Sequence, residues 1–458
     1  MIDARAALAR SPAHEVALDC LTAGIAAADP AQLTRESVSR DGDTLIIDGT
    51  SYALGDYDEV LVLGGGNAAA VVAEELEAIL GEQLDGGIVV TDSPRSTDRV
   101  DVLAGDHPVP SEQGVESTRR LLETARAADE STLVLGVITG GGSALMAAPA
   151  AEISLGDLQS TTDALLASGA TISEINAVRK HCSAIKGGRL AAATAPAPVH
   201  CLVVSDVVGN DLATIASGPF VPDPTTYADA RDVLDRYDCD VPKPVSRRLN
   251  RGAAGEIEET PTADDTSFSS VATTIIGDGL TAVRAAADRA TAAGFDPLVL
   301  SSRIRGEARE TAKTHVAIAE EIQASGEPVA PPAVIVSGGE TTVTVDGDGT
   351  GGPNQEFVLS AAVEFAGEAA TGSTATDAVA SAAANIVVAA VDTDGIDGVT
   401  DAAGGIVDAE TVDPSAARRA LGNNDATPVL AGADALVHTG PTGTNVNDLR
   451  VVVVPDTG

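Results

Sequence analysis

Two glycine-rich loops hold some of the residues best suited to binding anions. The first, Gly64-Gly65-Gly66-Asn67, follows an apolar run and opens a G-x-G-x-x-A pattern, with Asp92 at the end of the next apolar run. Such a loop can place the phosphates of a dinucleotide at a helix N-terminus. It can equally be a tight strand-to-helix turn that needs glycine for its backbone geometry. The pattern alone leaves both interpretations open.

The second loop, Gly140-Gly141-Gly142-Ser143, again lies between an apolar run and an alanine-rich stretch. Successive backbone N–H groups in such a loop can form a nest for an anion, and Ser143 can cap the following helix. No Gly-Lys-Ser/Thr follows, so the loop is not a Walker A motif. The sequence therefore favours binding of phosphate or carboxylate over a turn of purely structural purpose.

A basic segment, INAVRKHCSAIKGGRL, provides the positive charge that an anion site requires. Within eleven residues it contains Arg179, Lys180, His181, Lys186 and Arg189, in a chain whose formal net charge is −40. Charge runs usually form a solvated face, but the surrounding sequence is overwhelmingly acidic. We therefore interpret this segment as the one dense basic cluster and as part of an anion site.

Acidic and amide side chains follow several apolar runs. Asp206 and Asp211 in SDVVGND are placed to hold Mg²⁺ or to accept a proton from a hydroxyl group. VDTDGIDG resembles the start of a calcium loop, but its twelfth position is Ala403 rather than Glu, which excludes an EF-hand. GGPNQEF and TGPTGTNVNDL are rich in Asn, Gln and Thr, which suits recognition of hydroxyl and phosphate groups.

The charge balance restricts the class of protein. There are 68 Asp and Glu residues against 28 Lys and Arg, spread along the whole chain, and aromatic residues make up only 2%. Such self-repulsion is tolerable where salt screens it, which indicates a halophilic cytoplasm. No basic patch with interleaved aromatic residues exists, so nucleic-acid binding is not expected.

Other sequence signals point to the same compartment. No apolar run reaches the roughly 18 residues of a membrane span, and the first residues lack the apolar core of a signal peptide, so we expect no membrane association. The cysteines, Cys20, Cys182, Cys201 and Cys239, are far apart and form no C-x-x-C pair. This predicts a reducing, cytoplasmic environment without a zinc site.

The elements that must position these residues alternate regularly. Short β-branched runs, glycine turns and alanine-rich stretches recur from Asp58 to Leu80, Gly86 to Pro94, Ser131 to Pro149 and His200 to Asp211. Continuous apolar strands alternating with helices predict an α/β fold whose parallel sheet is covered on both faces. Ligands in such folds bind beyond the carboxyl ends of the strands, where these glycines cluster.

The length of 458 residues predicts two domains, which we place at 1–250 and 268–458. The pattern fails between Arg247 and Ser270, which we interpret as the inter-domain connection. A second α/β unit follows, with strands in PAVIVSGG, NIVVAAVD and LRVVVVP. The stretch from Gly367 to Ala384 has the composition of a low-complexity surface excursion.

Taken together, these segments resemble the glycerate 2-kinases whose C-terminal domain is called MOFRL. The resemblance runs in collinear order through GDHPVPSEQG, ITGGGSALMAAP, INAVRKHCSAIKGGRLA, SDVVGNDLATIASGPFVPDPTT, VSGGETTVTV, GGPNQEF, DTDGIDGVTDAAGG and TGPTGTNVNDL. Eight ordered motifs covering nearly the whole chain are far more specific than any single glycine loop.

The resemblance implies a larger Rossmann-like, doubly wound N-terminal domain, a smaller α/β MOFRL domain and a cleft between them. It implies phosphorylation of D-glycerate at its 2-hydroxyl with ATP and Mg²⁺, giving 2-phosphoglycerate. The expected catalytic residues are Lys186, Arg179 and Asp206, with Asp206 and Asp211 as metal ligands. The expected substrate- and phosphate-binding residues are Gly64, Gly65, Gly66, Asn67, His107, Gly140, Gly141, Gly142, Ser143, Arg189, Gly338, Gly339, Glu340, Asn354, Gln355, Glu356, Asn445 and Asn447.

Two positions depart from the family pattern. Relatives usually have Lys where this chain has Asn67, and Arg where it has Pro353, and both are regarded as catalytic. We expect Lys186 and Arg179 to replace the missing charge, with Asn67 as a neutral hydrogen-bond donor. Two alternatives remain open: an NAD(P)H-dependent hydroxypyruvate reductase, suggested by the first glycine loop and Asp92, and a non-catalytic binding descendant of the kinases. A homodimer is left open as the assembly.

The distributed negative charge predicts that the fold requires concentrated salt. The melting temperature should rise from low to multimolar KCl, because counterions screen repulsion among the 68 carboxylates. Thermal melting followed by circular dichroism across a KCl series measures this directly. A melting temperature that stays constant or falls with added salt would contradict the prediction.

Overall fold

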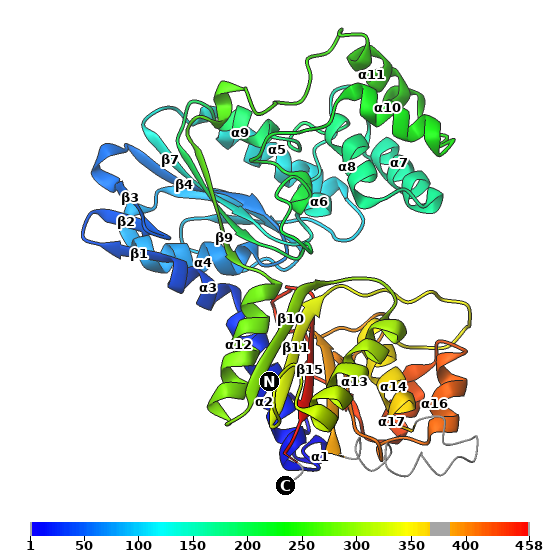
Figure 1. Cartoon of the computed structure of the whole chain (residues 1–458). Coiled ribbons are helices and arrows are strands. Elements are labelled where there is room, and N and C mark those ends of the chain that lie inside the picture. Colours follow the sequence, from blue (N-terminus) through cyan, green and yellow to red (C-terminus); the bar gives the residue numbers. More distant parts are fainter. Residues whose placement is uncertain (1, 367–384, 457–458) are drawn as a thin grey trace. The chain divides into compact units, whose positions relative to one another are not determined.

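The computed structural model describes residues 2–366 and 385–456, and the chain divides into two compact units (Figure 1). The parallel-sheet unit is Pro30–Ile276, and the mixed-sheet unit combines Met1–Asp29 with Gly277–Gly458. The predicted surface excursion at 367–384 lies outside the described residues. No described helix is both long enough and apolar enough to span a bilayer.

A six-stranded sheet organises the parallel-sheet unit, in the order β6-β5-β4-β7-β8-β9. The neighbours from β6 to β8 pair in parallel. This is the strand order of a doubly wound fold, and the winding direction reverses between β4 and β7. The strands are β4 (Glu59–Gly65), β5 (Gly86–Thr91), β6 (Asp101–Ala104), β7 (Thr132–Ile138), β8 (Val199–Val204) and β9 (Val271–Gly277).

Helices connect these strands and form a further layer beyond the sheet. They are α3 (Pro30–Ser37), α4 (Ala69–Leu80), α5 (Glu112–Ala127), α6 (Gly142–Leu145), α7 (Leu155–Ser168), α8 (Ile172–His181), α9 (Arg189–Thr194), α10 (Tyr227–Arg236) and α11 (Lys243–Ala253), with short 3₁₀ turns η1 (Leu54–Asp56), η2 (Gly81–Gln83), η3 (Ile215–Ser217) and η4 (Thr266–Phe268). A small antiparallel sheet of β1 (Val38–Asp41), β2 (Thr44–Ile47) and β3 (Thr50–Ala53) precedes β4.

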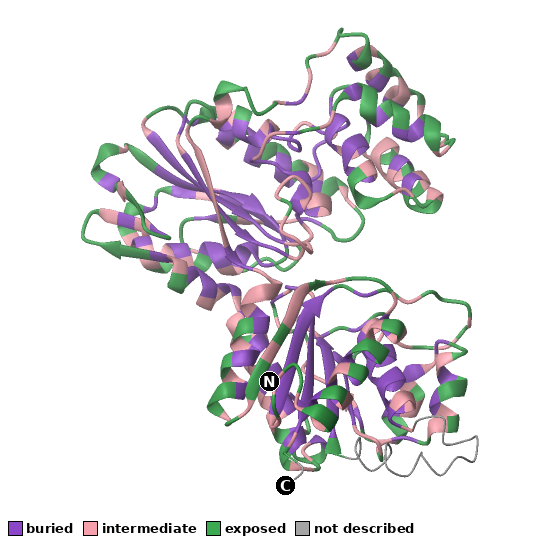
Figure 2. Cartoon of the chain, viewed as in Figure 1, coloured by how far each residue is buried: buried purple, intermediate pink, exposed green. Residues whose placement is uncertain are grey.

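Apolar burial explains why these segments fold as they do. Every residue of β7 is buried, as its unbroken apolar run predicts for a strand covered on both faces (Figure 2). Helices α7, α8, α10 and α11 form their own small core around Val178, Tyr227 and Leu249. The basic segment of α8 is therefore held between a helical core and the sheet.

The mixed-sheet unit has the strand order β10-β11-β15-β12-β13-β14. Only β10 and β11 pair in parallel, and the later pairs are antiparallel. Its strands are β10 (Asp296–Ile304), β11 (Ala333–Gly339), β12 (Val387–Asp392), β13 (Gly404–Val407), β14 (Leu436–Val437) and β15 (Asp448–Val454). The last strand of the chain, β15, lies in the interior of this sheet and is buried along its whole length.

Helices cover both faces of the mixed sheet. Helices α2 and α12 pack on one face, and α13 and α14 pack on the other (Figure 1). The helices of this unit are α1 (Arg5–Leu8), α2 (Pro12–Ala27), α12 (Gly279–Ala292), α13 (Ala308–Ser325), α14 (Pro353–Phe365), α16 (Pro414–Leu421) and α17 (Ala426–Gly432). The α/β class predicted for both parts of the chain is confirmed.

The stretch from Arg247 to Ser270 differs from the irregular segment that its composition suggested. Its first residues continue α11 as far as Ala253, because Val245 and Leu249 are buried on one face of that helix. The strand β9 that follows joins the parallel sheet, and the compact units divide after Ile276. The composition of this stretch did not predict the helix, because only one narrow stripe of the helix surface is apolar.

Glycine is required where β4 and β7 end side by side. Gly64 has φ of 156°, and a Cβ atom there would lie 1.9 Å from the carbonyl oxygen of Val137. Gly66 has φ of 141°, and a Cβ atom there would lie 2.1 Å from the Thr139 hydroxyl oxygen. Only residues without a side chain allow the two strands to approach this closely at their carboxyl ends.

Replacing Gly64 with alanine should therefore destabilise the parallel-sheet unit. The added methyl group meets backbone that cannot move away, so we expect a loss of about 3 kcal/mol and a clearly lower melting temperature. Gly156→Ala is the matched control, because its Cβ atom would meet nothing closer than 3.8 Å, at the Ser154 hydroxyl. If the two variants melt at the same temperature, the close approach of β4 and β7 is not a constraint.

Candidate active site

The two glycine loops lie next to each other and are hydrogen-bonded together. They follow β4 and β7, which are neighbours at the point where the winding of the sheet reverses. The Asn67 N–H donates to the Gly140 carbonyl oxygen at 2.8 Å, and the Ala68 N–H donates to the Thr139 hydroxyl at 3.1 Å. The Ala69 N–H donates to the Gly66 carbonyl at 3.1 Å. The amides that a dinucleotide phosphate would need in the first loop are already used within the protein.

The side chains of Asn67 and Asp206 both lie against the second loop. A Cβ atom on Gly141 would be 2.1 Å from the Asn67 amide oxygen, and one on Gly140 would be 2.3 Å from the Asp206 carboxylate. Glycine at both positions is what admits these two side chains. The structure therefore brings Asn67, Gly140, Gly141 and Asp206 together, although they come from three separate segments.

A cavity of about 410 Å³ opens beside this loop, within the parallel-sheet unit. Six of the residues expected at the site line it. They are His107, Gly141, Ser143, Arg179, Lys186 and Asp206. The volume falls in the roughly 300–1,000 Å³ range of sites for small organic ligands.

Lys186 is the most deeply buried cation of the cavity. Its side chain is nearly inaccessible, and its ammonium donates to the carbonyl oxygens of Ser143 at 2.7 Å and of Met146 at 3.5 Å. Burial, together with the positive charge of Arg179, lowers the pKa of Lys186 to about 7. An anion bound here would restore the charged form.

The other basic residues of the segment have structural partners. Lys180 pairs with the buried Asp223 at 3.1 Å, and His181 contacts Glu259 at 2.8 Å. Arg189 does not line the cavity, and its guanidinium lies 3.5 Å from the Tyr227 hydroxyl.

No carboxylate within hydrogen-bonding distance of Arg179 or Lys186 is found in the described part of the chain. Buried or partly buried cations without a carboxylate partner are costly to hold, because burial penalises their charge. In a chain with 68 acidic residues, their isolation indicates a site that takes its negative charge from a ligand.

Asp206 and Asp211 differ in their suitability for a metal ion. Burial raises the pKa of Asp206, while its own backbone N–H and the charge of His107 partly oppose that shift. The Asp211 carboxylate is exposed and accepts hydrogen bonds from the Ala213 N–H at 3.1 Å and the Thr214 hydroxyl at 2.7 Å. Asp211 therefore stabilises its own turn.

Among residues 2–366 and 385–456, no group of three or more His, Cys, Asp or Glu side chains is arranged to hold a metal ion. A magnesium site made of one carboxylate, substrate phosphates and water needs no such group. Asp206 beside an anion-binding cavity fits that kind of site.

Two polar residues missed by the sequence interpretation, Asn176 and Ser217, lie at the cavity or directly behind its lining. Asn176 lies one turn before Arg179 on α8, and both line the cavity. The Ser217 hydroxyl donates to the Asn176 amide oxygen at 3.0 Å and lies 2.9 Å from the Ser143 hydroxyl. The spacing of Asn176 and Arg179 at i and i+3 could have indicated a shared face.

Three of the expected residues of the mixed-sheet unit belong to a buried polar network at the start of α14. Asn354 donates to Asp448 at 2.6 Å and to Asp397 at 3.2 Å, and Gln355 donates to Thr400 at 2.9 Å. Glu356 pairs with Arg309 at 2.7 Å. These side chains stabilise the start of α14 within this unit.

The carboxylates of this network are poorly solvated. Burial raises the pKa of Asp397 to about 6, although the Asn354 and Gln355 N–H groups donate to it. Burial and the neighbouring Asp394 and Asp448 raise the pKa of Asp392 well above its usual value. Asp392 and Asp394 each accept a backbone N–H from two residues ahead, which is the hydrogen bond of an Asx-turn.

The remaining expected residues lie at the carboxyl end of β11 and before β15. A Cβ atom on Gly339 would lie 2.1 Å from the Ile304 carbonyl oxygen, to which the Glu340 N–H donates at 2.9 Å. Gly338 precedes this close approach. Asn445 accepts the Asn447 N–H at 3.0 Å, and Asn447 has φ of 68°. Backbone geometry accounts for Gly339, Asn445 and Asn447.

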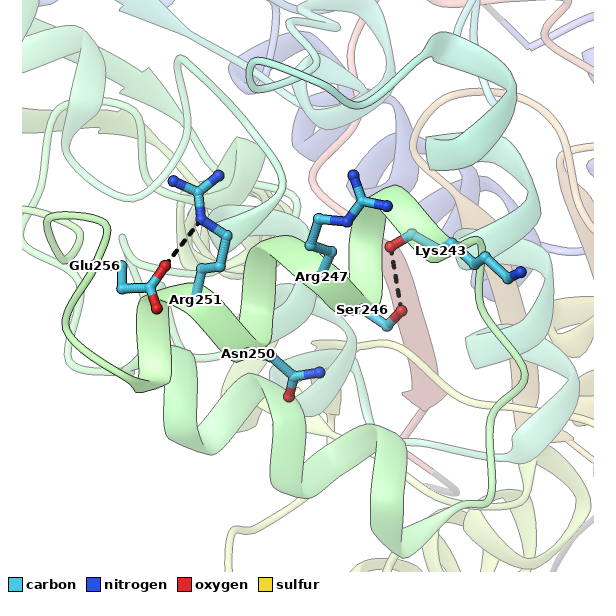
Figure 3. Close-up of a pocket in the computed structure, with 6 residues that line it drawn as sticks. All are labelled: Lys243, Ser246, Arg247, Asn250, Arg251 and Glu256. Carbon is cyan, nitrogen blue, oxygen red and sulfur yellow. Dashed lines mark hydrogen bonds and ion pairs between the residues drawn. The ribbon is translucent and has the colours of Figure 1, made fainter.

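A second basic cluster on α11 corrects the inference that the chain has only one. Lys243, Arg247 and Arg251 are spaced four residues apart on the outer face of α11, beside a shallow recess of about 460 Å³ (Figure 3). Arg251 contacts Glu256 at 3.2 Å and Glu152 at 3.5 Å. Arg248 points inward and donates to the His181 carbonyl at 2.7 Å. This cluster is separate from the cavity.

Comparisons with known proteins place the chain among characterised relatives. Residues 16–250 match a family described as a domain of unknown function (DUF4147), and residues 333–448 match the MOFRL family. The chain is 38% identical to a glycerate 2-kinase of Pyrococcus horikoshii, covering 96% of this chain and 97% of the relative.

Two further relatives carry different names. The chain is 40% identical to a proposed hydroxypyruvate reductase of Agrobacterium vitis, covering 86% of this chain and 87% of that one. A crystal structure of a glycerate kinase from Thermotoga maritima matches with a TM-score of 0.82 and 35% identity, covering 96% of this chain and 99% of that chain. The fold and nearly the full length are thus shared with glycerate kinases.

Proposed function

Since the chain belongs to the glycerate kinase family and is an enzyme of the kinase class, we propose that it transfers the terminal phosphate of ATP to the 2-hydroxyl of D-glycerate, giving 2-phosphoglycerate. The observation that carries this proposal is the pair Arg179 and Lys186, two cations that line one cavity without a carboxylate partner among the described residues. Both substrates of the reaction are anions, so either supplies the missing negative charge.

Phosphoryl transfer needs positioning and charge stabilisation more than covalent chemistry from the protein. The 2-hydroxyl oxygen of glycerate forms the new bond to phosphorus as the bond to the ADP oxygen breaks. Lys186 and Arg179 offset the charge that spreads over the transferred group. The amide of Asn67, held against Gly141, donates a neutral hydrogen bond where relatives place lysine.

We assign Asp206 the role of general base, which its burial and raised pKa favour. It accepts the proton of the attacking hydroxyl, for which a raised pKa makes a carboxylate better suited. Asp206 would also hold Mg²⁺, which would supply positive charge to offset that of the phosphate groups. Asp211 is less suited to either role, because its carboxylate already stabilises its own turn.

The name of the Agrobacterium vitis relative favours the reductase alternative, but the hydrogen bonds of the first glycine loop argue against it. A dinucleotide would require free amides in the Gly64–Asn67 loop, but those of Asn67, Ala68 and Ala69 donate within the protein. A non-catalytic descendant would explain Asn67 and Pro353 but not the isolated cations of the cavity. The kinase accounts for more of the structure than either alternative.

Some expectations stay predictions. They are the assignment of residues 1–250 to the kinase domain and 268–458 to the MOFRL domain, the cytoplasmic location, and a homodimer as the assembly.

A coupled assay separates the three candidate functions. In multimolar KCl with Mg²⁺, ATP and D-glycerate should give ADP and 2-phosphoglycerate, identified by phosphorus NMR. NADH or NADPH with hydroxypyruvate should not be oxidised. Formation of only 3-phosphoglycerate, or oxidation of NAD(P)H without consumption of ATP, would overturn the proposal.

Removing either cavity cation should impair turnover more than folding. Lys186→Ala and Arg179→Ala should each lower kcat/KM by roughly 10²-fold or more, because the charge they offset is largest in the transition state. The melting temperature should change little, since neither residue has an ion-pair partner in the part of the chain that the structure describes. Lys313→Ala, which removes an exposed lysine paired with Glu310, is the control and should retain full activity.

The pH profile distinguishes a functional from a structural Lys186. With its pKa lowered to about 7, the free enzyme loses the cation as pH rises through that value, so kcat/KM should fall there. Lys186→Arg keeps the charge and should move that fall to higher pH. Near-native activity of both alanine variants would show that these cations are not used in catalysis.

A further inference from the structure

The cavity has a polar floor and an apolar wall, and the proposed reaction uses only the floor. Ser143, Asn176, Arg179, Lys186 and Asp206 supply the polar groups. Apolar side chains line the rest, chiefly Val109, Leu158, Leu166 and Ile172. Neither glycerate nor a phosphate chain has an apolar surface that such a wall could cover.

Exposure of large apolar side chains is concentrated at this wall. Val109, Leu166 and Ile172 are 58%, 59% and 53% exposed. In the described part of the parallel-sheet unit, they are the only large hydrophobic residues in the exposed class, and all three line the cavity. On an otherwise charged surface, such a cluster indicates a face that a ligand covers.

Local contacts hold this wall in shape. Gln159 on α7 donates to the Pro110 carbonyl at 2.7 Å and so fixes the loop that carries Val109. Ile172 begins α8 directly after Thr171, whose side chain and that of Glu174 form a capping box. The apolar surface is thus built before any ligand arrives, which limits the ordering cost of binding.

We propose that Val109, Leu166 and Ile172 bind the purine base of the phosphate donor, while Arg179 and Lys186 bind its phosphate chain. This rests on the proposed function, because it assumes that a nucleoside triphosphate enters this cavity. A purine has flat apolar faces and a polar edge. Gln159, Thr162 and Asp163 of α7 line the same cavity and offer hydrogen-bonding groups for that edge.

The test compares ATP with inorganic tripolyphosphate, which has a phosphate chain but no base. We expect Val109→Ser/Leu166→Ser/Ile172→Ser to bind ATP about 10-fold more weakly than the wild type, because apolar contact with the base is lost. Its affinity for tripolyphosphate should stay unchanged. Isothermal titration calorimetry with Mg²⁺ in multimolar KCl measures both.

Two further variants control the comparison. Val345→Ser replaces a valine that is 69% exposed and does not line this cavity, and it should bind both compounds like the wild type. Leu166→Ser alone should weaken ATP binding in the same direction. Since all three wall residues are exposed, unchanged melting temperatures are expected throughout.

The possible results distinguish the assignment of the apolar wall from the proposed function. If the wild type phosphorylates glycerate but the triple variant keeps the wild-type ratio of ATP to tripolyphosphate affinity, the assignment of the wall is wrong and the proposed function stands. If the variant instead turns a dimer into a monomer with ATP binding intact, the wall is a contact with a second copy. If the wild type binds neither compound and transfers no phosphate, the proposed function itself fails.

Discussion

A buried ammonium group without a carboxylate partner among the described residues is the constraint on which the proposed site depends. Lys186 gives its hydrogen bonds to backbone carbonyl oxygens, and Arg179 adds a second positive charge nearby. Water would solvate both charges better than this cavity does. A chain so rich in carboxylates could pair them easily, as it does Lys180 with Asp223. Their isolation is explained if a substrate anion completes the site.

The sheet supplies the frame for that arrangement. Reversal of the winding between β4 and β7 brings the two glycine loops together, and the glycines allow the strands to end in near contact. Hydrogen bonds from the first loop to the second then fix the position against which Asn67 and Asp206 lie. The glycine pattern of the first loop is thus explained by packing against β7, and a bound dinucleotide is not needed to account for it.

Local patterns in the sequence predicted much of this structure. Unbroken apolar runs before glycine turns indicated the parallel strands, because a strand covered on both faces has no polar side. The same reasoning located β15 from LRVVVVP but could not show that it is an interior, antiparallel strand. Pairing direction depends on contacts between distant segments, which composition does not encode. The helical end of α11 was hidden for a related reason, since its buried stripe is only Val245, Leu249 and Gly252.

Local sequence patterns predicted the functional residues less completely than the secondary structure. The density of basic residues in INAVRKHCSAIKGGRL predicted an anion site, but it did not predict which of these cations would line that site. Lys180 pairs with Asp223 and His181 contacts Glu259, and these partners lie 43 and 78 residues away in the chain. Only the folded structure separates these two from Arg179 and Lys186. Asn176 and Ser217 were missed because uncharged residues carry no comparable signal.

A crystal structure with 2-phosphoglycerate bound would show whether Arg179 and Lys186 bind the substrate anion. We predict that the phosphate or the carboxylate of the ligand lies within hydrogen-bonding distance of both the Arg179 guanidinium and the Lys186 ammonium. A ligand that is well ordered elsewhere, with these two cations still facing an empty cavity, would contradict it.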